Sequence, residues 1–200
     1  MFFGQNSQIK HYFLKFYIRK SLFVSFSRRA SANALNREKK TALNYAIETS
    51  STRAVDALCD HDGITGSEMY QGKYNIHIAA AVGNPEIVQI LLDKGHASPT
   101  QRTIKKQCTP LHIACSQGHF EVVKVIIGEI EAKQSGFLSS YINMLDKTKA
   151  TSLHHAQTVY EEGTRFKIVE FLKNKGADVG LKDKRGTLAS FAQPTRPRHR

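Results

Sequence analysis

The sequence predicts an all-α repeat solenoid built from stacked pairs of helices. Three observations support this fold: a short segment recurs four times, its copies start 33, 35 and 42 residues apart, and an apolar helical run follows each copy. The four copies occupy residues 41–46, 74–79, 109–114 and 151–156. Repeated units of this length stack side by side and share one continuous core.

The best-preserved copy, at residues 109–114, reads T-P-L-H-I-A and has the features of a helix start. Threonine can cap the first turn of a helix, and proline fits its first position. The leucine and the alanine face the neighbouring repeat, where the small alanine lets helices approach closely. A glycine in the left-handed conformation is expected to end the short helix. Such a glycine follows the second, third and fourth copies as Gly83, Gly118 and Gly163, whereas the first copy lacks one.

This T-P-L-H-x-A start resembles that of the ankyrin repeat, which is a turn followed by two antiparallel helices. The resemblance covers roughly residues 35–192. It implies about four repeats plus a partial fifth that starts at Thr187, joined by short β-hairpin or loop fingers. It also divides the chain into a basic aromatic arm (1–34), an ankyrin-repeat domain (35–192) and a basic tail (193–200) that is expected to be disordered.

Two stretches depart from the regular period. Residues 131–149 are longer than the period allows and contain several apolar residues, which predicts a lengthened helix or an ordered insert. The fourth repeat carries three extra residues before its turn, around residues 159–162. Insertions in repeat proteins map to loops on one face, which is often the binding face.

The arm at residues 1–34 is rich in basic, serine and aromatic residues and has no acidic residue. Three interpretations stay open for it. It could be a helix that covers the open end of the repeat stack, a transit peptide, or a segment that contacts a membrane surface through residues 1–30.

The chain has 200 residues, a formal net charge of +12 and three cysteines, Cys59, Cys108 and Cys115. Their odd number and wide spacing argue against a disulfide framework and favour a reducing compartment. No stretch reaches the roughly 18 consecutive apolar residues of a transmembrane helix. We therefore expect a cytoplasmic location, with the nucleus or a membrane surface as alternatives.

The sequence predicts no enzyme, no cofactor and no metal site. It lacks the common nucleophile-elbow, zinc-protease, phosphate-loop and dinucleotide motifs. His77, His112 and His154 hold equivalent positions in successive repeats, about 8–10 Å apart, which is too far for one ion; the resemblance implies that they bond to backbone near the fingers. Cys108, His112 and Cys115 look like a partial zinc set, but a fourth ligand is missing, and Cys115 is expected to be a core residue.

The residues just before each repeat start are basic, and the resemblance places them at the tips of the fingers. Stacked fingers would form one basic edge, which favours an acidic protein partner; nucleic acid is less favoured because no nucleic-acid-binding motif is present. The family's binding positions add residues on the concave side. The candidate partner-binding residues are Arg37, Lys40, Glu48, Tyr70, Gln71, Lys73, Lys105, Lys106, Ser116, Gln117 and Lys147.

The leading hypothesis is a monomeric, non-catalytic protein–protein interaction module that acts as an adaptor or as an inhibitor masking its partner. One such role in the family belongs to the inhibitors of Rel-type transcription factors, which also bind through a concave repeat surface. Two alternatives stay open. One is a fragment or cytosolic repeat domain of a larger ankyrin-containing protein, such as an ion channel. The other is a membrane- or organelle-targeted ankyrin protein.

Overall fold

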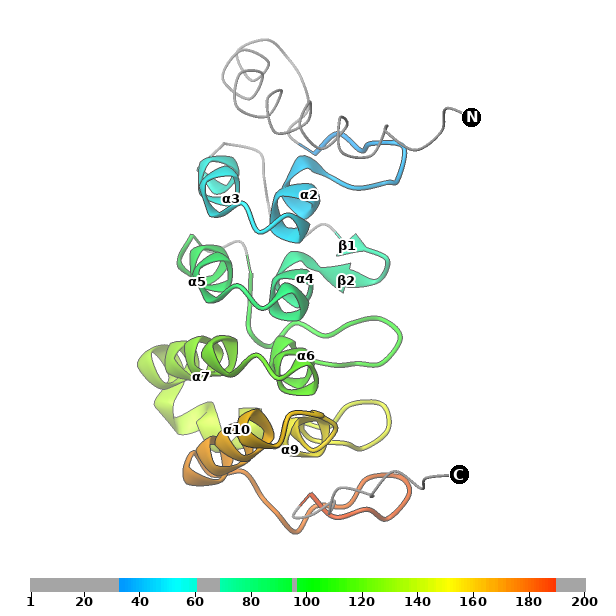
Figure 1. Ribbon diagram of the computed structural model, residues 1–200, viewed down its shortest axis with the longest axis vertical. Helices are drawn as coiled ribbons and strands as arrows, with labels where there is room; N and C mark the ends of the chain where they lie inside the picture. The colour runs from blue at the N-terminus through cyan, green and yellow to red at the C-terminus, as the bar shows by residue number, and fades with distance from the viewer. Residues whose placement is uncertain (1–32, 61–68, 95–96, 190–200) are drawn as a thin grey trace.

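The computed structural model describes residues 33–60, 69–94 and 97–189, and it shows a ladder of stacked helix pairs (Figure 1). Along the chain, each repeat consists of a finger that projects to one side, an inner helix and an outer helix; these three parts lie side by side in Figure 1. The arm predicted at 1–34 and the tail predicted at 193–200 lie outside the described residues, apart from Asn33 and Ala34.

The inner helices carry the recurring segment, and the outer helices carry the apolar runs. The inner helices are α2 (Ala42–Glu48), α4 (Asn75–Val82), α6 (Pro110–Gln117) and α9 (Ser152–Ala156). The outer helices are α3 (Thr52–Cys59), α5 (Pro85–Asp93), α7 (Phe120–Gln134) and α10 (Glu162–Asn174). The second finger contains an antiparallel pair of short strands, β1 (Met69–Tyr70) and β2 (Lys73–Tyr74), in which Met69 faces Tyr74.

The predicted threonine caps are confirmed in three of the four inner helices. The Thr41 hydroxyl accepts a hydrogen bond from the backbone N–H of Asn44 at 3.1 Å, and Thr109 and Thr151 cap α6 and α9 in the same way. The side chain of the third helical residue bonds back to the cap: Asn44 Oδ1, for example, accepts from Thr41 N at 3.0 Å. These reciprocal bonds satisfy N–H groups that the start of a helix would otherwise leave unpaired.

The left-handed helix ends are confirmed at Gly83 (φ 85°) and Gly118 (φ 77°). In the first repeat Ser50 takes this conformation without a glycine (φ 52°). The expectation for Gly163 is wrong, because Gly163 lies inside the first turn of α10, while α9 ends at Ala156 and is capped by Gln157 in a right-handed conformation. The extra residues between these two helices let the chain turn over a longer path, so no left-handed residue is needed there.

The insert predicted within residues 131–149 is ordered. The helix α7 is 15 residues long and continues through a 3₁₀ turn (Ser135–Phe137) into α8 (Leu138–Ile142). Tyr141 and Ile142 are fully buried, and the Tyr141 hydroxyl donates to the carbonyl oxygen of Pro99 at 2.9 Å. The insert is therefore part of the core.

One continuous apolar core runs the length of the ladder and includes residues from every helix pair. Cys115 is fully buried in it, as predicted. The partial fifth repeat is described only as a finger, in which Lys182 and Leu188 form an antiparallel bridge. Its expected helix, after Thr187, extends past the described residues.

Candidate functional site

In the first, fourth and fifth fingers, an Asn or Asp side chain at the start of the finger caps the turn. Asn36 Oδ1 accepts from the N–H groups of Glu38 and Lys40, both at 2.9 Å. Asp146 Oδ1 accepts in the same way from Thr148 N at 2.7 Å and Ala150 N at 3.0 Å. Asp and Asn favour such turns because their short side chains reach backbone N–H groups two residues on. The Asn or Asp that precedes each of these turns is a signal in the sequence from which the turns could be predicted.

Neighbouring fingers are hydrogen-bonded to one another through their backbones. Ile104 N donates to Gly72 O at 3.0 Å, and Lys147 N donates to Lys106 O at 2.9 Å. Lys184 N donates to the carbonyl oxygen of Thr148 at 2.8 Å. The four fingers from the second to the fifth are therefore bonded into a continuous row along one side of the stack, and the first finger lies on the same side (Figure 1). We call these five fingers the finger edge.

This finger edge is strongly basic, as the sequence predicts. Each of its exposed basic side chains has no ion-pair partner in the part of the chain that the structure describes. They are Arg37, Lys39, Lys73, Lys105, Lys106, Lys147, Lys149, Lys182, Lys184 and Arg185. Five of the candidate partner-binding residues belong to this set, so the structure brings them to one edge.

Lys40 differs from the other basic candidates because it is engaged within the chain. Its ammonium group lies 2.7 Å from Glu48 and 3.0 Å from Glu38, and it sits 5.4 Å from the ring centroid of Tyr70. The hydrogen bond with Glu48, followed by that with Glu38, raises the pKa of Lys40 above its ordinary value. The candidates Lys40, Glu48 and Tyr70 therefore form one local cluster that ties the first finger to α2 and to the second finger.

The remaining candidates lie on the second finger and on α6. Gln71 occupies the tip of the second finger with φ 51°, and its amide donates to the Tyr70 hydroxyl at 2.9 Å. Ser116 is half-buried and bonds to the carbonyl oxygen of Ile113 at 2.9 Å, whereas Gln117 is exposed. Ser116 thus satisfies its hydroxyl within its own helix, and Gln117 is the more accessible of the two.

The histidines of the recurring segment join each repeat to the next. The Nε2 atoms of His77, His112 and His154 lie 3.1, 3.2 and 3.1 Å from backbone carbonyl oxygens in the following finger. Burial lowers the pKa values of His77 and His112 to about 4, so both rings are neutral at pH 7. These contacts confirm the predicted backbone bonding of the three histidines.

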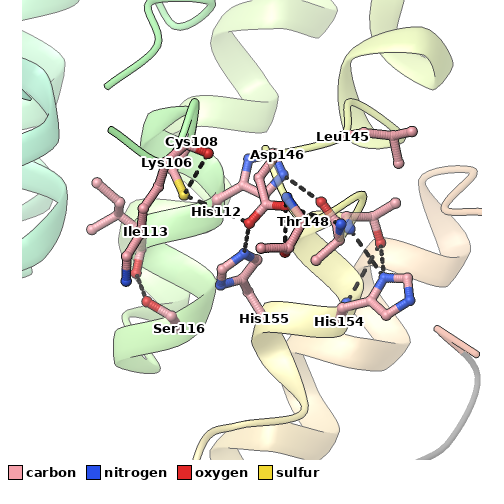
Figure 2. Close-up of polar contacts among 12 residues, drawn as sticks. Lys106, Cys108, His112, Ile113, Ser116, Leu145, Asp146, Thr148, His154 and His155 are labelled. Carbon is pink, nitrogen blue, oxygen red and sulfur yellow. Dashed lines mark hydrogen bonds and ion pairs between the residues drawn. The ribbon is translucent and has the colours of Figure 1, made fainter. Parts of the chain in front are cut away.

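A second group of polar residues, not predicted from the sequence, gathers between the third and fourth repeats (Figure 2). It consists of Cys108, Asp146 and His155, which we call the Cys–Asp–His cluster. Asp146 Oδ2 lies 3.0 Å from His155 Nε2 and 3.9 Å from Cys108 Sγ. Cys108 and Asp146 are buried, and His155 is half-buried.

The electrostatics of the cluster follow from its burial and its hydrogen bonds. Burial raises the pKa of Cys108 to about 11, and the nearby Asp146 carboxylate adds to this effect. Burial also works against ionisation of Asp146, but hydrogen bonds from Thr148 and His155 outweigh it and lower the Asp146 pKa to about 2. The cluster therefore holds a fixed negative charge beside a protonated thiol.

The cluster replaces the partial zinc set considered from the sequence. Both ring nitrogens of His112 are occupied, Nδ1 by Thr109 and Nε2 by the Ala150 carbonyl oxygen. Cys115 is enclosed in the core. Cys108 instead contacts Asp146, which lies 38 residues further along the chain in the following repeat. Only the length of the repeat period could have suggested that these two residues are close.

Comparison with known proteins settles the family. A family model described as ankyrin repeats, in three copies, matches residues 9–103 and 76–183. The chain belongs to the ankyrin-repeat family. It is similar to the solved ankyrin repeat domain of Bcl-3, which is described as a unique member of the IkappaB protein family. The match covers 80% of this chain and 66% of that chain, with 26% sequence identity and a TM-score of 0.65.

Two human relatives show the same repeats within much longer proteins. The chain is 31% identical to transient receptor potential cation channel subfamily A member 1 over 139 residues, which is 68% of this chain. It is 27% identical to inversin over 128 residues, or 62% of this chain. It spans only 12% of the length of each of these two relatives.

Ankyrin repeats are generally non-catalytic modules of protein–protein interaction, and this ankyrin domain has the continuous finger edge and inner helices of such a module. Within residues 33–60, 69–94 and 97–189, no helix has the length and apolar character needed to cross a membrane.

Proposed function

We propose that this ankyrin domain is an adaptor or a masking inhibitor that binds an acidic peptide or an acidic protein surface along its finger edge and concave side. The observation that carries the proposal is the row of exposed, unpaired basic side chains on fingers that are bonded into one edge. The proposed partner is a protein, because the repeats that carry this edge belong to an interaction family.

The charge of the finger edge favours acidic partners and predicts how they bind. Lys105 and Lys106 on the third finger have no acidic neighbour within ion-pair distance among the described residues, so their charge is uncompensated. Charges on an exposed rim steer association and make it sensitive to salt more than they add to the affinity of the final complex. We therefore expect binding that is fast at low ionic strength and weaker at high ionic strength.

The backbone bonds between the fingers add preorganisation. The spacing of Lys106 and Lys147 is fixed by the 2.9 Å bond between their backbones, so a partner need not order these segments on binding. Preorganised surfaces lose less conformational entropy on association than flexible ones do. The edge is thus suited to a partner that spans several fingers.

The test is affinity purification with the full chain as bait, at low and high salt, beside the double variant Lys105→Glu, Lys106→Glu. A matched control, Arg53→Glu, Lys167→Glu, changes the net charge equally but alters exposed residues of α3 and α10 in the outer layer, which have no ion-pair partner among the described residues. For each partner identified, we expect the finger variant to raise the Kd at least about tenfold, which is a loss of ~1.4 kcal/mol of binding free energy. The control should leave the Kd nearly unchanged. Equal affinity of the finger variant and the control for the partner, or insensitivity to salt, would contradict the proposal.

The compartment we propose is the cytoplasm. No disulfide joins Cys59, Cys108 and Cys115, all of which the structure describes as buried, and reduced cysteines are usual in reducing compartments. A fluorescent fusion of the full chain, with and without residues 1–30, tests this location and the targeting alternative together. Membrane or organelle signal that depends on residues 1–30 would favour the alternative.

A second candidate function is a repeat domain within a larger ankyrin-containing protein such as an ion channel. It is favoured by the similarity to the cation channel, which covers 68% of this chain but 12% of the channel. Sequencing of the transcript on both sides of the present reading frame tests it, because a larger protein requires additional coding sequence in frame.

A further inference from the structure

Three segments that are distant in the sequence place potential metal ligands at one point (Figure 2). Cys108 ends the third finger, Asp146 begins the fourth finger, and His155 lies on α9. One ligand atom from each of the three residues lies within 4.8 Å of the other two. No other group of three or more His, Cys, Asp or Glu side chains in the part of the chain that the structure describes meets this condition.

We infer that Cys108, Asp146 and His155 bind one divalent transition-metal ion, with Zn²⁺ as the best match. Sulfur, imidazole nitrogen and carboxylate oxygen are the three ligand types that zinc uses in proteins, at about 2.3, 2.0 and 2.1 Å. Ligand atoms around one tetrahedral ion at these bond lengths lie about 3.5 Å apart. The observed separations of 3.0 and 3.9 Å from Asp146 Oδ2 bracket that value.

The hydrogen bonds of the fourth finger hold Asp146 in position to be a ligand. Its Oδ1 atom accepts from Thr148 N, the Thr148 hydroxyl and Ala150 N, at 2.7, 2.7 and 3.0 Å. The other oxygen, Oδ2, is thereby directed at His155 and Cys108. Supporting bonds of this kind fix the orientation of metal ligands and strengthen metal binding.

The charges of the site also suit a divalent cation. On binding, the thiol of Cys108 gives its proton to solvent and becomes a thiolate, as cysteine ligands do. The thiolate and the Asp146 carboxylate then carry two negative charges, which balance the ion, and His155 binds as a neutral ring. A buried site needs this balance, because an uncompensated charge away from water is costly.

The accessibility of the three residues indicates how the ion reaches the site. The side chain of His155 is 23% exposed, whereas that of Asp146 is 4% exposed. Entry from the His155 side would leave the fourth coordination position to water. Because the ligands belong to two repeats, the ion would also join the third repeat to the fourth and would stabilise the stack by mass action.

The test uses the full chain, freed of metal by a chelator and kept reduced with a phosphine. Co²⁺ is titrated, and the thiolate-to-cobalt charge-transfer absorption in the near ultraviolet is measured. We expect one Co²⁺ per chain and displacement by Zn²⁺. Cys108→Ser should abolish the band, and His155→Gln should weaken the apparent affinity at least about tenfold, since even losing a supporting residue costs that much.

Cys59→Ser is the matched control, because it removes another buried cysteine, on α3, away from the cluster. It should leave the band unchanged. His155→Gln keeps an amide that can donate to Asp146, and Cys108→Ser is nearly isosteric, so both variants are expected to fold; melting followed by circular dichroism without metal checks this.

X-ray absorption of the zinc complex gives an independent readout, with one sulfur neighbour expected at about 2.3 Å. The inference is overturned if the wild type shows no charge-transfer band at saturating Co²⁺. It is also overturned if the band and the affinity persist in both Cys108→Ser and His155→Gln.

Discussion

The first and third inner helices place different residues at the same position, and they couple to their neighbours in different ways. In α6, His112 accepts from Thr109 N at 3.2 Å, and its Nε2 lies 3.2 Å from the Ala150 carbonyl oxygen in the next finger. In α2, Asn44 also bonds back to its capping threonine, but its amide nitrogen reaches only the side chain of Asn75, at 2.5 Å.

The difference shows what the imidazole ring contributes. The longer ring spans from its own cap to the backbone of the following finger, so it satisfies a carbonyl group that the stacking buries. The shorter Asn44 side chain meets another side chain, and the Nδ2 atom of Asn75 is buried with no hydrogen-bond partner in the described structure. Unsatisfied buried groups cost free energy, so we expect the first repeat to be the more weakly coupled.

The largest effect is expected for His112→Ala. The substitution leaves a cavity and removes the partners of both Thr109 N and the Ala150 carbonyl, so the free energy of unfolding should fall by about 4 kcal/mol. The corresponding Asn44→Ala change should cost about 2 kcal/mol, since it breaks no bond to the next finger. Urea denaturation of both variants measures the difference, and equal losses would remove the distinction between the two interfaces.

The next effect is a pH dependence located at His77. The folded protein keeps His77 neutral down to a pKa of about 4, whereas the unfolded chain takes up this proton near pH 6.5. The stability contributed by His77 is therefore complete above pH 6.5 and is lost as the pH falls toward 4, by about 3 kcal/mol.

Denaturation in chelator-containing buffer between pH 7.5 and 4.5, for the wild type and His77→Gln, measures this contribution. The variant should have a shallower loss of stability on acidification. Parallel pH profiles for the two proteins would show that folding does not lower the His77 pKa.

The smallest effect concerns the residue that follows the capping threonine. It is Pro110 in the third repeat but Ser152 in the fourth, where the serine hydroxyl is buried with no partner among the described residues. Thr109 and Thr151 have nearly the same backbone angles, with φ −80° and −89° and ψ 166° and 170°, and these angles suit a following proline.

Ser152→Pro should therefore stabilise the protein by about 1 kcal/mol, because it removes an unsatisfied hydroxyl and restricts the unfolded chain. Thermal unfolding of the variant beside the wild type checks this. A lower melting temperature would mean that the N–H or the hydroxyl of Ser152 stabilises the fourth repeat, although Pro110 at the same position of the third repeat has neither group.

The fold was predictable to a large extent because its signals are local. The threonine caps, the left-handed Gly83 and Gly118, and the apolar runs of the outer helices each depend on residues within a few positions of one another. Gly163 shows where this reasoning fails. A glycine at the expected place does not end a helix when extra residues provide another path for the chain.

The candidate site was predictable only in part. The sequence indicated the basic finger tips, since a repeat places equivalent residues in a row. It did not indicate that Lys40 is paired with Glu48 and lies over the ring of Tyr70. Nor did it connect Cys108 with Asp146 and His155, because the distance between side chains on adjacent repeats depends on how the repeats stack.

The sequence by itself determined the repeated unit, the number of helix pairs and the sign of the charge along the fingers. These follow from capping residues, apolar periodicity and composition, which act over short distances in the chain. The tertiary structure alone decided which charges are free and which polar side chains meet between repeats. Stacking brings together residues 38 positions apart, such as Cys108 and Asp146, and only the packing of one helix pair on the next fixes whether their atoms come within reach.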